Sequence, residues 1–230
     1  MAWWVKAMSD NTLTLAQQIS DFTAAAEQRL PADYLAAFRA LVADLEDQGI
    51  GQAGPAVGDS FPDFALTDHT GHRIQASARW NERTLMLKFY RGGWCPYCNL
   101  ELAALMRHAD DFAALGVEVL AIAPERPELL DQTREKSAPG FTFLWDEGNG
   151  LARKLGIAFD VDARVKAIYK QIGIDLQAAN GSWVLPVPAT FVVSAGRVLY
   201  RFVDPNYLVR QDPAHLLQEL RSRLPLDKRT

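Results

Sequence analysis

The feature that most constrains the fold of this chain is the segment Cys95-Pro96-Tyr97-Cys98, which follows a run of apolar residues. That run, Thr84–Tyr90, is typical of a central strand. Proline favours the first position of a helix, so Cys95 is predicted to be the N-cap of a helix. After this helix, Val117–Ala123 is again apolar and predicts a second strand. A strand, a helix and a strand in this order predict two parallel strands joined by a right-handed crossover.

The two cysteines are the only ones in the chain, and their position predicts redox chemistry. A cysteine with a pKa near 8.5 supplies little thiolate at neutral pH. At a helix start, free backbone N–H groups and the positive end of the helix dipole stabilise a thiolate, so we expect a lowered pKa for Cys95. Cys98 lies one turn later, on the side expected to be buried. We therefore predict that Cys95 attacks and Cys98 resolves by closing a disulfide.

Two other interpretations of the cysteine pair are inert small hydrophobic side chains and half of a zinc site. A structural zinc ion needs four ligands, and only His69 and His72 form a plausible second cluster. A Cys-x-x-Cys that opens a helix after a strand is a fairly specific redox signal. We therefore expect no metal and no cofactor.

The N-terminal part of the chain has a helical pattern. Apolar residues recur at helical spacing from Leu13 to about Gln48, and Pro31 divides the pattern into two helices. Four glycines and a proline follow between Gly49 and Gly58 and are typical of a linker. We predict a helical extension over residues 1–56 and a main domain over 57–230. The helical hairpin is expected either to pack against the core or to form a homodimer.

The rest of the main domain alternates between strand and helix patterns. Residues 157–185 show the weakest secondary-structure pattern, apart from one possible helix. The predicted elements, in chain order, are a hairpin over 61–74, helices over 127–136 and 148–155, a strand over 141–145, a helix over 163–172, an antiparallel hairpin over 186–203 and a final helix over 213–224.

Charge and hydropathy exclude several classes of function. The formal net charge is −4, and the acidic excess lies in residues 1–56, which carry three Lys or Arg against seven Asp or Glu. A pI near 5.6 and the lack of a basic stripe argue against nucleic-acid binding. No apolar run reaches the roughly 18 residues of a membrane span. Residues 1–10 lack the continuous apolar core of a secretory signal, so we expect a cytoplasmic protein.

Several segments resemble one known family. Phe89–Cys98 resembles the active-site segment of the peroxiredoxin-like proteins of the alkyl hydroperoxide reductase/thiol-specific antioxidant (AhpC/TSA) superfamily. Val57–Phe64 and Pro188–Phe191 are similar to two further segments of that superfamily, so the resemblance covers about residues 57–203. It implies a thioredoxin-like three-layer α/β/α fold with a mixed central sheet. The N-terminal helical hairpin is similar to that of the same subgroup.

The resemblance also implies roles for single residues. Pro188 would be a cis-proline whose loop faces the disulfide and turns the backbone of Val187 toward a partner. Pro96 and Thr190 would support the active site. A trans proline at the start of an edge strand is the alternative for Pro188.

The sequence departs from the family pattern at several positions. Gly92 stands where typical peroxiredoxins have a peroxide-binding threonine, Lys88 stands at their proline, and Pro188 replaces an arginine. These changes move the site toward thioredoxin. The buried acid of thioredoxin is Phe89 here. Glu101 could substitute for it, but we expect Glu101 to be an exposed helix carboxylate.

Two residues next to the cysteines have open roles. Arg91 either steadies the Cys95 thiolate, binds an anion or is a surface arginine of a turn. Trp94 either shields the disulfide and packs against partners or is a plain core tryptophan. His108 is expected on the polar face of the helix.

The sequence therefore predicts a thiol–disulfide oxidoreductase that acts on a thiol reductant or a disulfide-bearing protein. The first alternative is a thiol-dependent peroxidase, in which Cys95 attacks a hydroperoxide, becomes a sulfenic acid and condenses with Cys98. The second alternative is a redox-sensing or scaffold module that binds a partner through its helical hairpin without turning over substrate.

Overall fold

The computed structural model describes residues 13–224. Residues 1–10, considered above for a secretory signal, lie outside the described residues. The strands are β1 (Ala65–Asp68), β2 (Arg73–Gln75), β3 (Thr84–Phe89), β4 (Val117–Ala123), β5 (Thr142–Trp145), β6 (Ala158–Asp160), β7 (Val184–Pro186), β8 (Ala189–Ser194) and β9 (Arg197–Val203). The helices are α2 (Leu15–Glu27), α3 (Ala32–Asp47), α4 (Ala76–Trp80), α5 (Pro96–Met106), α6 (Ala109–Ala114), α7 (Pro127–Ser137), η1 (Glu147–Asn149), α8 (Gly150–Lys154), α9 (Ala163–Gln171), α10 (Leu176–Asn180) and α11 (Pro213–Arg223).

Seven strands form one mixed sheet in the order β2-β1-β5-β4-β3-β8-β9. β3 runs parallel to β4, and β4 runs parallel to β5. The pairs β1–β2, β1–β5, β3–β8 and β8–β9 are antiparallel. The predicted parallel pairing of the two strands around the cysteine helix is confirmed, and so is the C-terminal hairpin.

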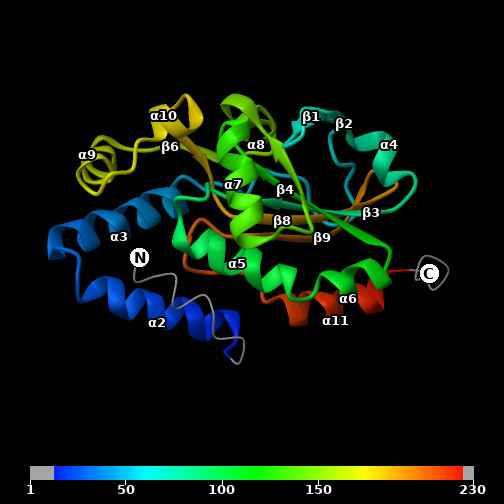
Figure 1. The fold of residues 1–230 in the computed structure, drawn as a ribbon, viewed down its shortest axis with the longest axis horizontal. Coiled ribbons are helices and arrows are strands. Elements are labelled where there is room, and N and C mark those ends of the chain that lie inside the picture. The colour runs from blue at the N-terminus through cyan, green and yellow to red at the C-terminus, as the bar shows by residue number, and fades with distance from the viewer. Residues whose placement is uncertain (1–12, 225–230) are drawn as a thin grey trace.

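Helices cover both faces of the sheet, which confirms the predicted three-layer α/β/α arrangement (Figure 1). Because side chains alternate along a strand, β3 contributes to two separate cores. Met86 packs on the same face as α2, α5, α6, α7 and α11. Leu85, Leu87 and Phe89 pack on the opposite face with α3, α4, α8, α9 and α10. The cysteines lie on the first of these faces.

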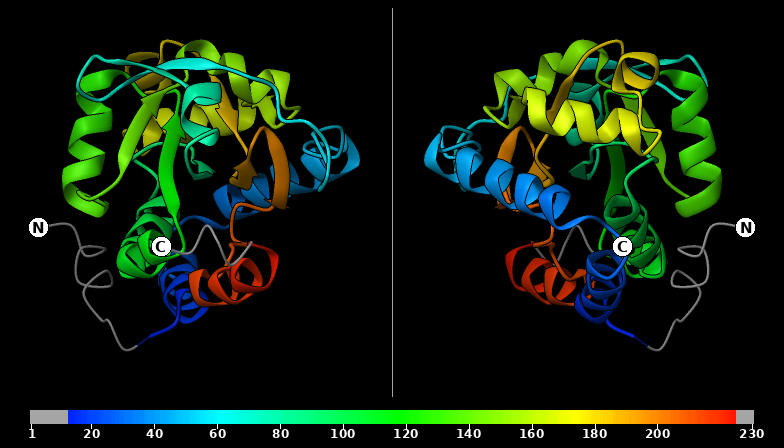
Figure 2. Two further views of the ribbon diagram at one scale, coloured as in Figure 1. Left: turned by 90° about the vertical axis from the view of Figure 1, so that its right-hand side faces the viewer. Right: turned by 90° about the vertical axis from the view of Figure 1, so that its left-hand side faces the viewer.

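The N-terminal hairpin packs against the domain. Its break at Pro31 is confirmed, since Pro31 is the N-cap of α3. α2 contacts α5 and α3 contacts α9, and Figure 2 shows α2 beside α5. The ring of Phe22 on α2 meets the ring of Tyr97 on α5 edge to face, with centroids 5.1 Å apart. Packing thus accounts for the apolar faces of both helices, while a homodimer and the domain boundary at residue 56 stay predictions.

Several local elements differ from the sequence predictions. The predicted cysteine helix breaks near His108, and α6 starts anew with the acidic side chains of Asp110 and Asp111 in its first turn, where a helix dipole favours them. α4, α10 and the two-stranded β6–β7 ladder were not predicted, because they are three to five residues long and carry little periodicity.

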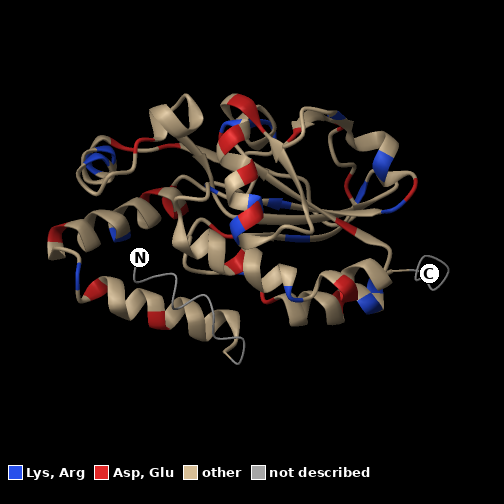
Figure 3. Ribbon diagram, viewed as in Figure 1, with Lys and Arg blue, Asp and Glu red and all other residues tan. Residues whose placement is uncertain are grey.

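Two observations bear on the excluded functions. Basic and acidic residues are interspersed over the helices of the described chain (Figure 3). Over residues 13–224, none of the helices combines the length and apolar character needed to cross a membrane.

Candidate active site

Cys95 is the N-cap of α5 and Pro96 is its first residue, as the sequence predicts. The turn before them begins where β3 ends, so the cysteines lie at the carboxyl end of a central strand. Both Cys95 and Cys98 are free thiols with no exposed surface. Cys98 was expected to be buried, but Cys95 is just as inaccessible, so an oxidant must reach it through the surrounding side chains.

The two thiols differ in acidity. Burial alone would raise the pKa of Cys95, but a hydrogen bond from Cys98 and the charges of Arg91 and Arg210 hold that pKa well below its usual value. Burial raises the pKa of Cys98 well above its usual value, and the thiol hydrogen bond to Cys95 and the charge of Cys95 raise it further. The two thiols thus share one proton, and Cys95 is the one that ionises more readily.

Arg91 lies against the nucleophile rather than on the surface. It is buried, and its Nη2 donates to the Cys95 Sγ over 3.0 Å. The guanidinium carbon lies 4.3 Å from the ring centroid of Tyr207, and Nη1 donates to the Tyr169 hydroxyl over 3.4 Å. These aromatic neighbours fix a charged group that would otherwise be costly to bury, and the surface-turn interpretation of Arg91 is wrong.

A second buried charge cluster lies beside Cys98. Lys88 Nζ donates to Glu101 Oε1, and Arg210 Nη1 donates to Glu101 Oε2, each over 2.5 Å. Both terminal nitrogens of Arg210 lie 3.8 Å from the Cys98 Sγ. Lys88 also donates to the hydroxyl of Thr190 over 3.2 Å. Thr190 thus contacts this cluster, and its role in supporting the active site stays a prediction.

The expected exposure of Glu101 is wrong, since its side chain is 1% exposed. Burial would raise the pKa of Glu101, but the charges of Lys88 and Arg210 hold it below its usual value. The prediction failed because α5 is buried on nearly every side, between the sheet and α2, so its helical periodicity does not mark a solvent face. The strand alternation explains why Lys88, and not Phe89, faces this helix.

Glu125 is a buried carboxyl that sequence reasoning missed. It follows β4, and its carboxylate accepts from the backbone N–H of Gly93 over 2.6 Å and from the hydroxyls of Tyr90 and Thr133 over 3.3 and 3.2 Å. Burial raises the pKa of Glu125 to about 7, and the charge of Cys98 contributes to the rise. The carboxyl can therefore give or take a proton at neutral pH beside the cysteine turn.

The turn between β3 and α5 requires glycine. Gly92 has φ of 145°, and a Cβ there would lie 2.3 Å from Trp94 Nε1. A Cβ on Gly93 would lie 2.0 Å from the Thr133 hydroxyl of α7. The tight turn lets Trp94 fold over the site, where its ring meets that of Tyr169 at 5.4 Å. The packing of Trp94 thus explains the glycine at position 92, independently of the threonine that typical family members have there.

The expectation of a cis-proline is wrong, because no peptide bond within residues 13–224 is cis. Pro188 is trans and buried between β7 and β8. The N–H of Val187 donates to the carbonyl of Ile157 over 2.8 Å, so it is not offered to a partner. The pairing of β6 with β7 uses the backbone of this segment, which is why the Val187 N–H is not free for a partner.

For some of the site residues that the sequence analysis missed, the position in the chain already indicates a place near the cysteines. Glu125 and Arg91 follow the carboxyl ends of two adjacent parallel strands, where side chains converge, so Glu125 was within reach of sequence reasoning. Arg210, Tyr169 and Tyr207 lie in segments without a motif. In residues 13–224 no group of three or more His, Cys, Asp or Glu side chains is placed to hold a metal ion.

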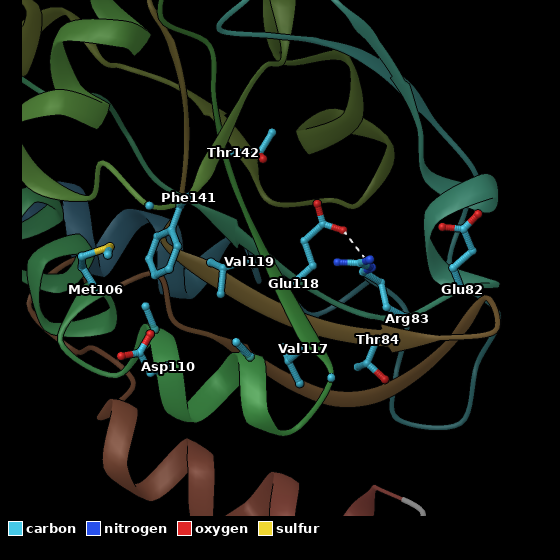
Figure 4. Close-up of a pocket in the computed structure, with 14 residues that line it drawn as sticks. Glu82, Arg83, Thr84, Met106, Asp110, Val117, Glu118, Val119, Phe141 and Thr142 are labelled. Atoms are coloured by element: carbon cyan, nitrogen blue, oxygen red, sulfur yellow. Dashed lines mark ion pairs between the residues drawn. The ribbon is translucent and has the colours of Figure 1, made fainter. Parts of the chain in front are cut away.

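Two cavities compete as candidate sites. The larger, of about 700 Å³, lies at the amino ends of β3 and β4, beside α6 (Figure 4). Of the carboxylates that line it, Glu118 is already paired with Arg79 and Arg83 at 2.7 and 3.7 Å. The smaller, of about 380 Å³, is lined by Arg91, Trp94 and other neighbours of the cysteines. Only the smaller cavity lies next to a reactive group.

A mixed sheet between two helical layers, with two thiols at the start of a helix that follows a central strand, is the arrangement of the thioredoxin fold. The model of the AhpC/TSA family matches residues 57–201. The chain therefore belongs to the AhpC/TSA family, as the resemblance in the sequence implied.

Relatives of known name are more distant. Peroxiredoxin Bcp of Escherichia coli (strain K12) is 31% identical over 100 residues, which are 44% of this chain and 64% of that protein. The chloroplastic peroxiredoxin Q of Oryza sativa subsp. japonica is 27% identical over 104 residues, 45% of this chain and 48% of that protein. The chain thus spans less than two thirds of the curated relatives it matches.

Solved structures share the fold. Peroxidoxin BcpB from Mycobacterium tuberculosis superposes with a TM-score of 0.57 at 21% identity, over 73% of this chain and 97% of that one. Reduced Prx3 from Vibrio vulnificus in complex with H₂O₂ gives a TM-score of 0.59 at 16% identity, over 72% of this chain and 98% of that one. Both confirm the thioredoxin-like fold.

Proposed function

We propose that this protein is a thiol-dependent peroxidase in which Cys95 reduces a hydroperoxide and Cys98 closes the disulfide. The observation that carries the proposal is a fully buried thiolate held by Arg91. A small oxidant can enter such a site, whereas a protein disulfide needs an exposed sulfur and a free strand edge beside it. The relatives named peroxiredoxin also favour this reaction over protein disulfide exchange.

The first step forms a sulfur–oxygen bond. The Cys95 thiolate attacks the terminal oxygen of ROOH, the O–O bond breaks, and Cys95 becomes a sulfenic acid while RO⁻ leaves and takes a proton to form ROH. Arg91 lies against the sulfur, so its charge stabilises both the attacking thiolate and the oxyanion that leaves. In this chain Arg91 thereby replaces the positive charge that the family places just before its Thr-Phe strand.

The second step forms the disulfide. The Cys98 thiol loses its proton and attacks the Cys95 sulfur, and the hydroxyl leaves as water. Glu125, with a pKa of about 7, is the carboxyl that can accept this proton. Arg210, 3.8 Å from the Cys98 sulfur, stabilises the thiolate that forms. Two equivalents of a thiol reductant then return the disulfide to the dithiol and are themselves oxidised to a disulfide.

The test is stoichiometric hydroperoxide consumption by the reduced protein with a thiol reductant. Turnover should be lost in Cys95→Ser. In Cys98→Ser one equivalent of hydroperoxide should be consumed and a sulfenic acid trapped at Cys95 by a sulfenate-specific reagent. Unchanged consumption by Cys95→Ser would refute the proposal.

The second candidate is the thiol–disulfide exchange predicted from the sequence. The observation in its favour is the Cys-x-x-Cys pair at a helix start, the arrangement of dithiol oxidoreductases. Reduction of a protein disulfide faster than that of any hydroperoxide, under the same conditions, would favour it. Either reaction needs a supply of thiol, which agrees with the predicted cytoplasmic location.

A further inference from the structure

A third cavity lies at the start of α7, and neither cysteine lines it. It encloses about 450 Å³, within the range of small-molecule sites. Its lining comes from three segments that are distant in the sequence: Arg126, Pro127 and Glu128, then Trp145 and Glu147, then Asn180 and Gly181. The backbone N–H of Arg126 donates to the carbonyl of Ala179 over 3.0 Å, so the first segment is fixed against the last.

The side chain of Asn180 is buried without a hydrogen-bond partner. Asn180 is 6% exposed, and among the described residues neither its amide oxygen nor its amide nitrogen has a partner. The hydroxyl of Ser182, one position beyond the cavity residue Gly181, is buried and unpaired as well. Leaving such groups unpaired lowers stability, and folded proteins keep few of them. A ligand in the cavity that Asn180 lines would supply the missing partners.

The amide of Asn180 restricts the chemistry of that ligand. A primary amide presents an acceptor and two donors side by side, so its best partner offers a donor and an acceptor in the same arrangement. A residue of an extended peptide has such a pair, as in antiparallel strands, where opposite residues exchange both N–H···O bonds. The backbone of an extended peptide therefore matches this side chain.

The charges around the cavity favour a ligand that carries both signs. Arg126, Glu128 and Glu147 are exposed, and within residues 13–224 none of the three is in an ion pair. A carboxylate can pair with Arg126, and an ammonium group with the two carboxylates. The half-buried ring of Trp145, whose Nε1 donates to the carbonyl of Pro124 over 3.3 Å, is a fixed wall for the apolar part of the ligand.

We infer that this cavity is a binding site for a small zwitterionic peptide. The peptide backbone lies on the amide of Asn180, its carboxylate at Arg126 and its ammonium group at Glu128 and Glu147. The site is independent of the proposed peroxidase reaction, because neither cysteine lines the cavity and binding involves no redox step.

Calorimetry with the tripeptide trialanine on the reduced, full-length protein tests the inference. Asn180→Leu keeps the size of the side chain and removes the amide, and it should weaken binding at least tenfold. Arg126→Gln should weaken binding in the same direction. Asn81→Leu and Arg153→Gln are the matched controls, since both positions are exposed and outside the cavity, and they should keep the wild-type affinity.

Stability without the peptide separates a ligand site from a structural role of the same amide. Asn180→Leu removes an unpaired buried amide, so its denaturation midpoint should equal or exceed that of the wild type. A lower midpoint for Asn180→Leu would show that the amide stabilises the fold, and it would overturn the inference.

The ligand itself supplies further controls. N-acetyl trialanine lacks the ammonium group and trialanine amide lacks the carboxylate, so each should bind more weakly than trialanine. Binding should be unchanged in Cys95→Ser, which separates a failure of this site from a failure of the peroxidase reaction. The inference is overturned by no binding of trialanine at millimolar concentration, by equal affinity of wild type and Asn180→Leu, or by tighter binding of adenosine monophosphate than of trialanine.

Discussion

Replacing Arg91 by methionine tests the electrostatic origin of the Cys95 thiolate. The guanidinium lies 3.0 Å from the sulfur, and both groups are buried. Two unit charges about 4 Å apart interact by about 4 kcal/mol at an effective dielectric constant near 20. The cost of burying the arginine offsets part of this, and charged hydrogen bonds contribute about 1.5–3 kcal/mol. At about 1.4 kcal/mol per pKa unit, Arg91→Met should raise the pKa of Cys95 by about 1–2 units.

The assay is thiolate absorbance near the ultraviolet edge against pH, supported by the pH dependence of alkylation. Both are measured in a Cys98→Ser background, so that one thiol titrates. Arg91→Lys keeps the charge and should give an intermediate pKa, while the exposed Arg153→Gln should leave the pKa unchanged. A midpoint for Arg91→Met equal to that of the parent would refute the reasoning. It would assign the low pKa to the helix start, the charge of Arg210 and the hydrogen bond from position 98.

Three further predictions concern the surroundings of the thiols. The pKa of Glu125 is raised from 4.5 to about 7, so the stabilisation from the protonated carboxyl is complete below pH 4.5 and is lost as pH rises through 7. The wild-type free energy of unfolding should therefore fall by about 3 kcal/mol over this window relative to that of Glu125→Gln. Denaturant titration at several pH values measures both. Glu101→Gln leaves two buried cations without their carboxylate and should lower the free energy of unfolding by about 3–5 kcal/mol. The control Glu135→Gln, at an exposed position, should lower it by under about 0.5 kcal/mol. Similar denaturation midpoints for the two variants would contradict the role of the cluster. Gly93→Ala should destabilise by about 1–3 kcal/mol through the contact with Thr133, and Thr133→Ala should reduce that cost in the double variant.

The elements with a strong local signal were predictable. Pro96 at the first helical position, the apolar run of β3 and the break at Pro31 each combine a local preference with a matching tertiary role, so sequence and structure agree. The lowered pKa of Cys95 was predictable in direction from its place at a helix start, although Arg91 and Arg210 contribute to it as well.

The rest of the site depends on contacts that periodicity does not encode. Glu101 and Arg210 lie 109 positions apart and meet only because the loop before α11 returns to α5. Glu101 is buried together with its two partners, Lys88 of β3 and Arg210 of the loop before α11. The engagement of the Val187 N–H depends on the pairing of β6 with β7, in a part of the chain that gave almost no pattern.

The placement of both sulfurs in one helical turn has a consequence for the speed of the catalytic cycle. Cys95 and Cys98 belong to the start of the same helix and already share a hydrogen bond. Condensation therefore needs a change of side-chain rotamer and no unwinding, and rotamer changes are faster by orders of magnitude than the local opening of a packed helix. The reduced and oxidised proteins should then share one backbone, with the helix holding both sulfurs in place while the disulfide forms and water leaves.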